Sequence, residues 1–153
     1  PHDNSNIVSS WDVLNGQEVT GDCVVIGGGL VGAETAEYLA NKGHQVTIVE
    51  MMDKIAAGES TTVLPLMMKD FADHNVKQLV NTKVDHIENN IVYTANEQIK
   101  ADTIINALGS KKNIFDDSSI TIPHVYVGDC SGERTADIAS AIRTAYHAAN
   151  EIG

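Results

Sequence analysis

Four glycines between two apolar segments are the residues of this sequence best suited to specific chemistry. The stretch "VVIGGGLVGAETAEYL" spaces three of them as Gly27-x-Gly29-x-x-Gly32, with Gly28 in between. In this pattern the first glycine allows a tight turn, the second lets the backbone approach a pyrophosphate, and the third lets a helix pack closely on a strand. A helix starting near Leu30 would direct its free N–H groups and positive dipole end at the phosphates. The spacing therefore predicts a site for a dinucleotide pyrophosphate.

An acidic residue supports this interpretation. Glu50 ends the next apolar strand, close to the spacing of about 20 residues expected for the group that binds the adenosine ribose. A carboxylate accepts hydrogen bonds from both ribose hydroxyls but repels a 2′-phosphate. Met51, Met52 and Asp53 follow it, and Lys54 is the nearest cation. We therefore expect NAD(H) rather than NADP(H). The alternative to dinucleotide binding is a glycine-rich turn in an ordinary α/β domain.

Other candidate chemical groups are weaker. Tyr38 and Lys42 have the Tyr-x-x-x-Lys spacing of short-chain dehydrogenases, but they lie at the far end of the first helix, where we interpret the match as a coincidence. The 6 histidines form no i, i+4 pair, and Cys23 and Cys130 share no zinc spacing. We identify no catalytic acid–base pair and no metal site.

The elements that must position the glycines alternate between strand and helix. Continuous apolar runs predict buried parallel strands at residues 22–26, 45–49, 76–80 and 102–108. Apolar positions at helical spacing predict helices at 30–42 and 61–74. From residue 83 to 100 the hydrophobic period falls to two, which predicts antiparallel strands that turn at 89–90 and 96–97. The pattern predicts an α/β fold: a Rossmann-like three-layer nucleotide-binding domain with a parallel sheet and an inserted antiparallel β-meander.

Length and charge restrict the partners. A chain of 153 residues suits one domain with its own core. Acidic residues outnumber basic ones 21 to 10, giving a formal net charge of -11, which disfavours nucleic acid and anionic membrane surfaces. The sequence shows no run suited to crossing a bilayer and no secretory pattern, so we expect a cytoplasmic location. Because it begins at Pro1, we expect a processed chain or a piece of a longer one.

Five segments resemble, in order, the pyridine-nucleotide-binding part of flavoprotein oxidoreductases. They are "NIVSSWDVLNG", "VVIGGGLVGAETAEYLANKGHQVTIVE", "VKQLVNTKVDHI", "ADTIINALGSKKN" and "VYVGDC". Within that superfamily the chain is similar to the C-terminal region of NADH:flavin oxidoreductases related to 2,4-dienoyl-CoA reductase and trimethylamine dehydrogenase. The resemblance implies a parent enzyme in which NADH passes hydride to a flavin. It also implies partner domains missing from this sequence: the rest of the FAD domain, and a barrel with FMN and an iron–sulfur cluster.

The resemblance assigns roles to residues outside the glycine turn. It implies that Glu34 lies near the nicotinamide and the flavin, with an ordinary helix-surface carboxylate as the alternative. It places Gly109 against the nicotinamide end, and Asp129, beside Gly128, at the ribityl chain of FAD. The predicted cofactor-binding residues are therefore Gly27, Gly28, Gly29, Leu30, Val31, Gly32, Glu34, Glu50, Met51, Gly109, Gly128 and Asp129.

The resemblance also divides the chain. Residues 1–19 are predicted to be a linker from the missing flavin domain, with one helical turn at Trp11–Leu14, and residues 20–109 to be the NAD(H)-binding domain. Residues 110–153 would be a linker plus the final strand (124–128) and helix (135–152) of an incomplete FAD-binding domain.

We therefore expect this chain alone to be inactive and to retain no FAD, because no second GxGxxG occurs and 2 cysteines cannot hold an iron–sulfur cluster. Its C-terminal apolar residues would fold back on the nicotinamide domain or pair with a second copy in a homodimer. The alternative function is a free-standing NAD(H)-binding or sensing module without catalysis.

Overall fold

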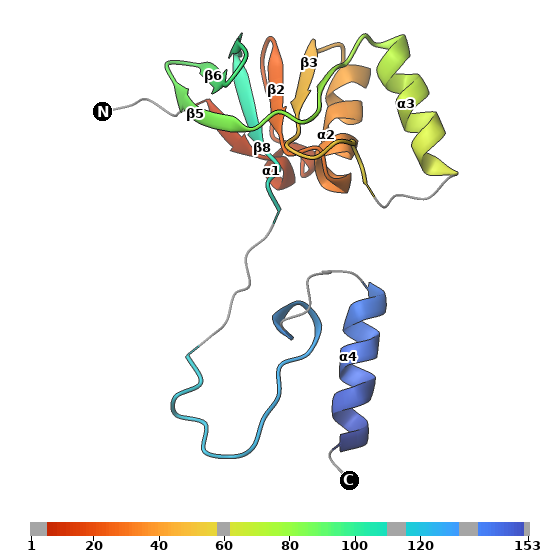
Figure 1. The fold of residues 1–153 in the computed structure, drawn as a ribbon, viewed down its shortest axis with the longest axis vertical. Helices are drawn as coiled ribbons and strands as arrows, with labels where there is room; N and C mark the ends of the chain where they lie inside the picture. The colour runs from red at the N-terminus through yellow and green to blue at the C-terminus, as the bar shows by residue number, and fades with distance from the viewer. Residues whose placement is uncertain (1–5, 58–61, 110–115, 132–137, 152–153) are drawn as a thin grey trace. The chain divides into compact units, whose positions relative to one another are not determined.

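The computed structural model describes residues 6–57, 62–109, 116–131 and 138–151 (Figure 1). The chain divides into two units, Pro1–Gly109 and Ser110–Gly153. In chain order the elements are β1 (Ile7–Ser9), α1 (Ser10–Leu14), β2 (Cys23–Ile26), α2 (Leu30–Asn41), β3 (Val46–Val49), α3 (Val63–Asp73), β4 (Lys77–Leu79), β5 (Val84–Glu88), β6 (Ile91–Thr94), β7 (Gln98–Lys100), β8 (Thr103–Asn106), the 3-10 helix η1 (Gly128–Cys130) and α4 (Ile138–Glu151).

A parallel sheet with strand order β1-β8-β2-β3-β4 is the centre of the first unit. Strand β2 occupies its middle, and Val25 pairs with Ile48 of β3 on one side and with Ile105 of β8 on the other. All four residues of β2 are buried, which explains why its sequence is a continuous apolar run rather than an alternating one.

The two faces of the sheet are covered differently, and this makes the three layers. On one face Val25, Ile48 and Ile105 pack with buried residues of the helices, including Leu39 of α2 and Phe71 of α3. On the other face the alternate strand positions pack against the meander in a cluster that contains Val24, Ile26, Val49, Ile104 and Val92. Figure 1 shows β5 and β6 on one side of the sheet and α2 and α3 on the other. The predicted α/β, Rossmann-like fold is confirmed.

The meander forms a second, antiparallel sheet in the order β5-β6-β7. Its first turn contains Asn89 and Asn90, both with positive φ, at 49° and 64°. Asparagine tolerates this left-handed backbone better than other side chains do, and two such residues suit the tight turn of a hairpin. The predicted turn at 89–90 is confirmed.

Two segments differ from the sequence-based expectation. Within the predicted polar lead-in, Ile7–Ser9 form strand β1, which pairs with β8 at the edge of the parallel sheet. A strand of three residues gives too little periodicity to be recognised from sequence. Residues 124–128, predicted to be a strand, form none. A strand needs a hydrogen-bonded neighbour, and none of the described residues pairs with this segment.

The second unit is small and is built around α4. Its predicted helix is confirmed over Ile138–Glu151, whereas residues 135–137 and 152 lie outside the described range. The N–H of Gly128 donates to Thr144 Oγ1 at 2.8 Å, so η1 is held against α4. Earlier in this unit, the Asp117 carboxylate accepts hydrogen bonds from Tyr126 and from His124 Nε2, the latter at 2.8 Å.

Candidate functional site

Two of the glycines that follow β2 are required by the fold itself. Gly27 has φ +102°, and a Cβ there would lie 2.6 Å from the carbonyl oxygen of Ala107. A Cβ on Gly32 would lie 1.9 Å from the carbonyl oxygen of Gly27. A side chain at either position would overlap backbone, so these glycines let α2 begin against the ends of β2 and β8.

At position 29, neither the backbone conformation nor the neighbouring atoms require a glycine. Its φ of -63° and ψ of -177° suit any residue. Apart from its two chain neighbours, no atom of the described residues would lie within 4 Å of a Cβ there. Gly29 is the N-cap of α2, which has no side-chain cap, so the leading N–H groups of the helix are left for an outside acceptor. The space beside Gly29 is therefore open to a ligand.

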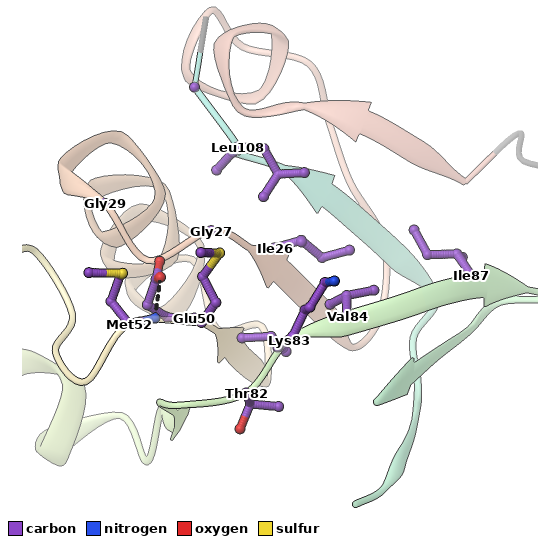
Figure 2. A pocket seen from close by; sticks show the side chains of 14 residues that line it. Ile26, Gly27, Gly29, Glu50, Met52, Thr82, Lys83, Val84, Ile87 and Leu108 are labelled. Carbon is purple, nitrogen blue, oxygen red and sulfur yellow. Dashed lines mark hydrogen bonds between the residues drawn. The ribbon is translucent and has the colours of Figure 1, made fainter. Parts of the chain in front are cut away.

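A pocket of about 550 Å³ opens at this point (Figure 2). It lies at the carboxyl ends of β2, β3 and β8. From β2 the chain continues to β3 and β4 on one side of the sheet, and it later returns to β8, which pairs with the other side of β2. Ligands of open α/β sheets bind at such switch points. The lining residues are Ile26, Gly27, Gly29, Val49, Glu50, Met51, Met52, Thr82, Lys83, Val84, Ile87, Ala107, Leu108 and Gly109.

The pocket wall is mostly apolar, with a few polar groups at defined places. Large apolar side chains at its rim are open to solvent, with Met51 66% and Leu108 72% exposed. Lys83 is the one cation among the described lining residues, and Figure 2 shows its side chain directed from the start of β5 toward the pocket. Lys54 does not line the pocket, although it is the cation nearest to Glu50 in the sequence.

Glu50 is the acidic group of the pocket, and it is only 9% exposed. Its Oε2 accepts a hydrogen bond from the N–H of Gly28 at 2.6 Å, and its Oε1 accepts one from the N–H of Met52 at 2.7 Å. Figure 2 shows the second of these bonds. Both oxygens are thus satisfied by backbone donors, which is how a carboxylate is kept in a largely buried place.

The predicted site residues divide into three groups. Five of them line the pocket: Gly27, Gly29, Glu50, Met51 and Gly109. Five others belong to the same turn or to α2 without lining it: Gly28, Leu30, Val31, Gly32 and the exposed Glu34. The remaining two, Gly128 and Asp129, lie in η1 of the second unit.

Sequence reasoning missed the wall that the meander contributes. Thr82 and Lys83 lie in the short connection between the end of β4 and the start of β5, and Val84 is the first residue of β5. A residue that follows a parallel strand lies at the carboxyl edge of the sheet, and this signal could have identified them. Their approach to the glycine turn depends on how the meander folds over the sheet, which the local pattern does not contain.

The cysteine in the sheet has no role in this site. Cys23 is buried, and desolvation, followed by the charges of Asp22 and Asp102, raises the pKa of its thiol to about 11. It is therefore a small core residue rather than a nucleophile. Among the described residues no group of histidine, cysteine or carboxylate side chains could hold a metal ion. In the same ranges, no helix has the length and apolarity needed to cross a membrane.

Comparison with known proteins agrees with this geometry. A sequence profile of the pyridine nucleotide-disulphide oxidoreductase family matches residues 2–151. The chain belongs to the pyridine nucleotide-disulphide oxidoreductase family. The resemblance carried by the five sequence segments is thereby confirmed.

Relatives of this oxidoreductase domain include much longer reductases. It is 44% identical over 155 residues to bilirubin reductase of Mediterraneibacter gnavus (strain CC55_001C), covering 96% of this chain and 24% of that protein. It is 31% identical over 159 residues to cinnamate reductase of Clostridium sporogenes, covering 95% and 23%. The solved structure of a 2-naphthoyl-CoA reductase complex with 2-naphthoyl-CoA superposes with a TM-score of 0.72 at 27% identity, covering 94% and 23%. The chain spans about a quarter of the length of these reductases.

Proposed function

We propose that this chain is the NAD(H)-binding part of a flavin-dependent oxidoreductase, in which it presents NADH to a flavin for hydride transfer. The observation that carries the proposal is Gly29. This glycine has an ordinary backbone and open space where a side chain would stand, at the rim of the pocket and at the start of α2. The need of a bound pyrophosphate for close backbone approach explains a glycine there, whereas the fold does not.

The pocket suits the parts of a dinucleotide in order. The pyrophosphate would lie over Gly29 and accept hydrogen bonds from the first turn of α2. The adenosine would lie toward Glu50 and Met51 at the end of β3, and the nicotinamide toward Gly109 at the end of β8. Bound NADH would supply the hydride, and these residues would bind it, orient it and exclude water.

Glu50 supports NADH over NADPH. A carboxylate offers about four acceptor positions, and backbone N–H groups use two of them, which leaves capacity for a ribose hydroxyl. The same charge opposes a 2′-phosphate. Lys83 is the cation of the pocket lining that would offset this charge if a phosphorylated ribose were bound.

The flavin would be held mainly by a part of the longer protein. Gly128 and Asp129 in η1 would contribute to its ribityl site. The sequence contains one glycine fingerprint, and the relatives are about four times as long. In this proposal, a reductase activity such as that of the bilirubin or cinnamate reductases therefore belongs to the longer protein and not to this chain alone. We expect this chain alone to bind NADH, to retain no FAD and to show no turnover.

Titration of the protein with NADH and NADPH, followed by nicotinamide fluorescence, tests the proposal. We expect saturable binding of NADH, weaker binding of NADPH and weaker NADH binding by the Gly29→Ala variant. Absence of NADH binding by a folded protein would refute the proposal, and a preference for NADPH would refute the choice of cofactor. The visible absorbance of a flavin would reveal any retained FAD.

A further inference from the structure

We infer that Glu50 is a positioning residue, which locks the glycine turn to the loop after β3 through Gly28. The lock makes the phosphate and adenosine ends of the pocket one rigid unit. This inference rests on the proposed function for its effect on NADH, but the lock itself exists in the ligand-free protein and is testable there.

Both backbone groups of Gly28 are bonded to the segment that follows β3. Its N–H donates to Glu50 Oε2 at 2.6 Å, and its carbonyl oxygen accepts from the N–H of Ala56 at 2.7 Å. The other Glu50 oxygen accepts from Met52 N–H at 2.7 Å, so one carboxylate bridges the turn and the loop. A bond from a backbone N–H to a buried carboxylate is among the stronger hydrogen bonds in proteins.

Packing strengthens the same connection. A Cβ on Gly28 would lie 2.5 Å from Ile55 Cδ1 and 2.9 Å from Glu50 Cβ. Ile55 and Ala56 are buried, and Ala56 holds a positive φ of 49°, which is unusual for a residue with a side chain. The loop is therefore fitted closely against the turn. Cofactor binding by Gly28 stays a prediction; the residue does not line the pocket, and these close contacts supply a structural reason for a glycine there.

The lock has a consequence for ligand binding. The N–H of Gly28 is already bonded, so the donors left for a pyrophosphate are those at Gly29 and the first turn of α2. Their positions depend on the turn that Glu50 holds. Met51 and Met52 line the pocket directly after Glu50, and the N–H of Met52 donates to the same carboxylate. Loss of one carboxylate oxygen would loosen both ends together.

Glu50→Gln is the informative substitution because it keeps size and shape. A glutamine has one acceptor oxygen, and its NH₂ group would face a backbone N–H, so one of the two bonds is lost. Asp53→Asn is the matched control, since it removes one negative charge from the same loop. Asp53 is exposed, does not line the pocket and forms no hydrogen bond among the described residues.

The ligand-free experiment measures amide hydrogen exchange and thermal unfolding. We expect Glu50→Gln, but not Asp53→Asn, to accelerate exchange at Gly28 and Met52. Gly28→Ala should lower the Tm, and adding Ile55→Val, which removes the Cδ1 atom in the way, should lower it less than the sum of the two single changes. Unchanged exchange at both amides, or strictly additive Tm changes, would overturn the lock. Exchange in Glu50→Gln decides the question even if Gly28→Ala does not fold.

The ligand experiment separates positioning from direct ribose contact. NADH is compared with an analogue whose adenosine ribose lacks both the 2′- and 3′-hydroxyls. If Glu50 acts through the turn, Glu50→Gln weakens the analogue as well as NADH, and the loss for the analogue is about tenfold for one charge-assisted hydrogen bond. If Glu50 acts only on the ribose, the variant weakens NADH and leaves the analogue unchanged, which would overturn the coupling. If the unmodified protein binds neither ligand, the proposed function fails, whereas the ligand-free experiment still decides the lock.

Discussion

Gly29→Ala is the substitution that best separates a cofactor-binding glycine from a structural one. It adds a single methyl group that would have no atom within 4 Å in the described part of the chain other than those of its two chain neighbours. The backbone there has φ -63° and ψ -177°, which alanine adopts without strain. The variant therefore changes the pocket and leaves the fold as it is.

The effect on stability is expected to be small because two contributions oppose each other. Replacing glycine by alanine in a compatible conformation stabilises a protein by about 0.4–1 kcal/mol through the unfolded chain. Alanine is a poorer N-cap than glycine, and this costs a similar amount at the start of α2. We expect a net change within about 0.5 kcal/mol, which corresponds to a Tm shift of roughly 4 °C or less for a unit of this size.

The effect on binding is expected to be much larger. The methyl group would stand where phosphate oxygens must approach the turn, so at least one hydrogen bond to the pyrophosphate would be lost. A hydrogen bond to a charged group contributes about 1.5–3 kcal/mol. The dissociation constant for NADH should therefore rise about 10- to 100-fold.

Two measurements on one preparation check this prediction. Thermal unfolding gives the stability change, and titration followed by NADH fluorescence gives the dissociation constant. Equal NADH affinity in the variant would show that no pyrophosphate lies over Gly29. Unfolding of the variant would show that the glycine is structural, contrary to the open space beside it.

Three further predictions follow from the same structure. Gly32→Ala should destabilise the protein by about 3 kcal/mol or more, because its methyl group would overlap the carbonyl oxygen of Gly27. Thermal unfolding would show this loss of stability, and a wild-type Tm would refute the structural role given to Gly32. Lys83→Gln should weaken NADH binding about two- to fivefold at low salt, whereas Lys54→Gln should not, and equal effects would contradict the pocket lining. In the second unit, a hydrogen bond to the backbone carbonyl of Ile122 and then the Asp117 carboxylate raise the pKa of His124. The His124–Asp117 ion pair therefore stabilises the unit fully below the ordinary histidine pKa of about 6.5. This stabilisation is lost as the pH rises through the pKa of His124 in the folded protein. Imidazole NMR should show the pKa of His124 falling in Asp117→Asn, and an unchanged titration would refute the pairing.

Much of the architecture could be predicted from the sequence because it is written in local patterns. A continuous apolar run predicted β2, helical spacing predicted α2, and two adjacent asparagines predicted the first turn of the meander. The glycine spacing predicted a strand, a tight turn and a helix in that order, and β2 and α2 follow this order in the structure. In these cases the cause of the structure lies within a few residues of its effect.

The short elements could not be predicted in this way. Strand β1 has three residues and exists because β8, almost a hundred residues later, offers it an edge. Residues 124–128 have the composition of a strand but lack a described partner, and they form none. A strand is defined by its neighbour, so periodicity alone neither ensures nor excludes one.

The surroundings of the individual predicted site residues were decided by the tertiary structure alone. Sequence spacing treats the glycines as one motif, whereas the fold places Ala107 against Gly27 and leaves Gly29 open. The sequence predicted an acidic residue at the end of β3, but not that Glu50 turns both oxygens to backbone N–H groups, one of them on Gly28. These differences arise because a hydrogen bond or a steric contact depends on atoms brought together from distant segments. Composition and period report whether a residue is buried; they do not report which atom it meets there.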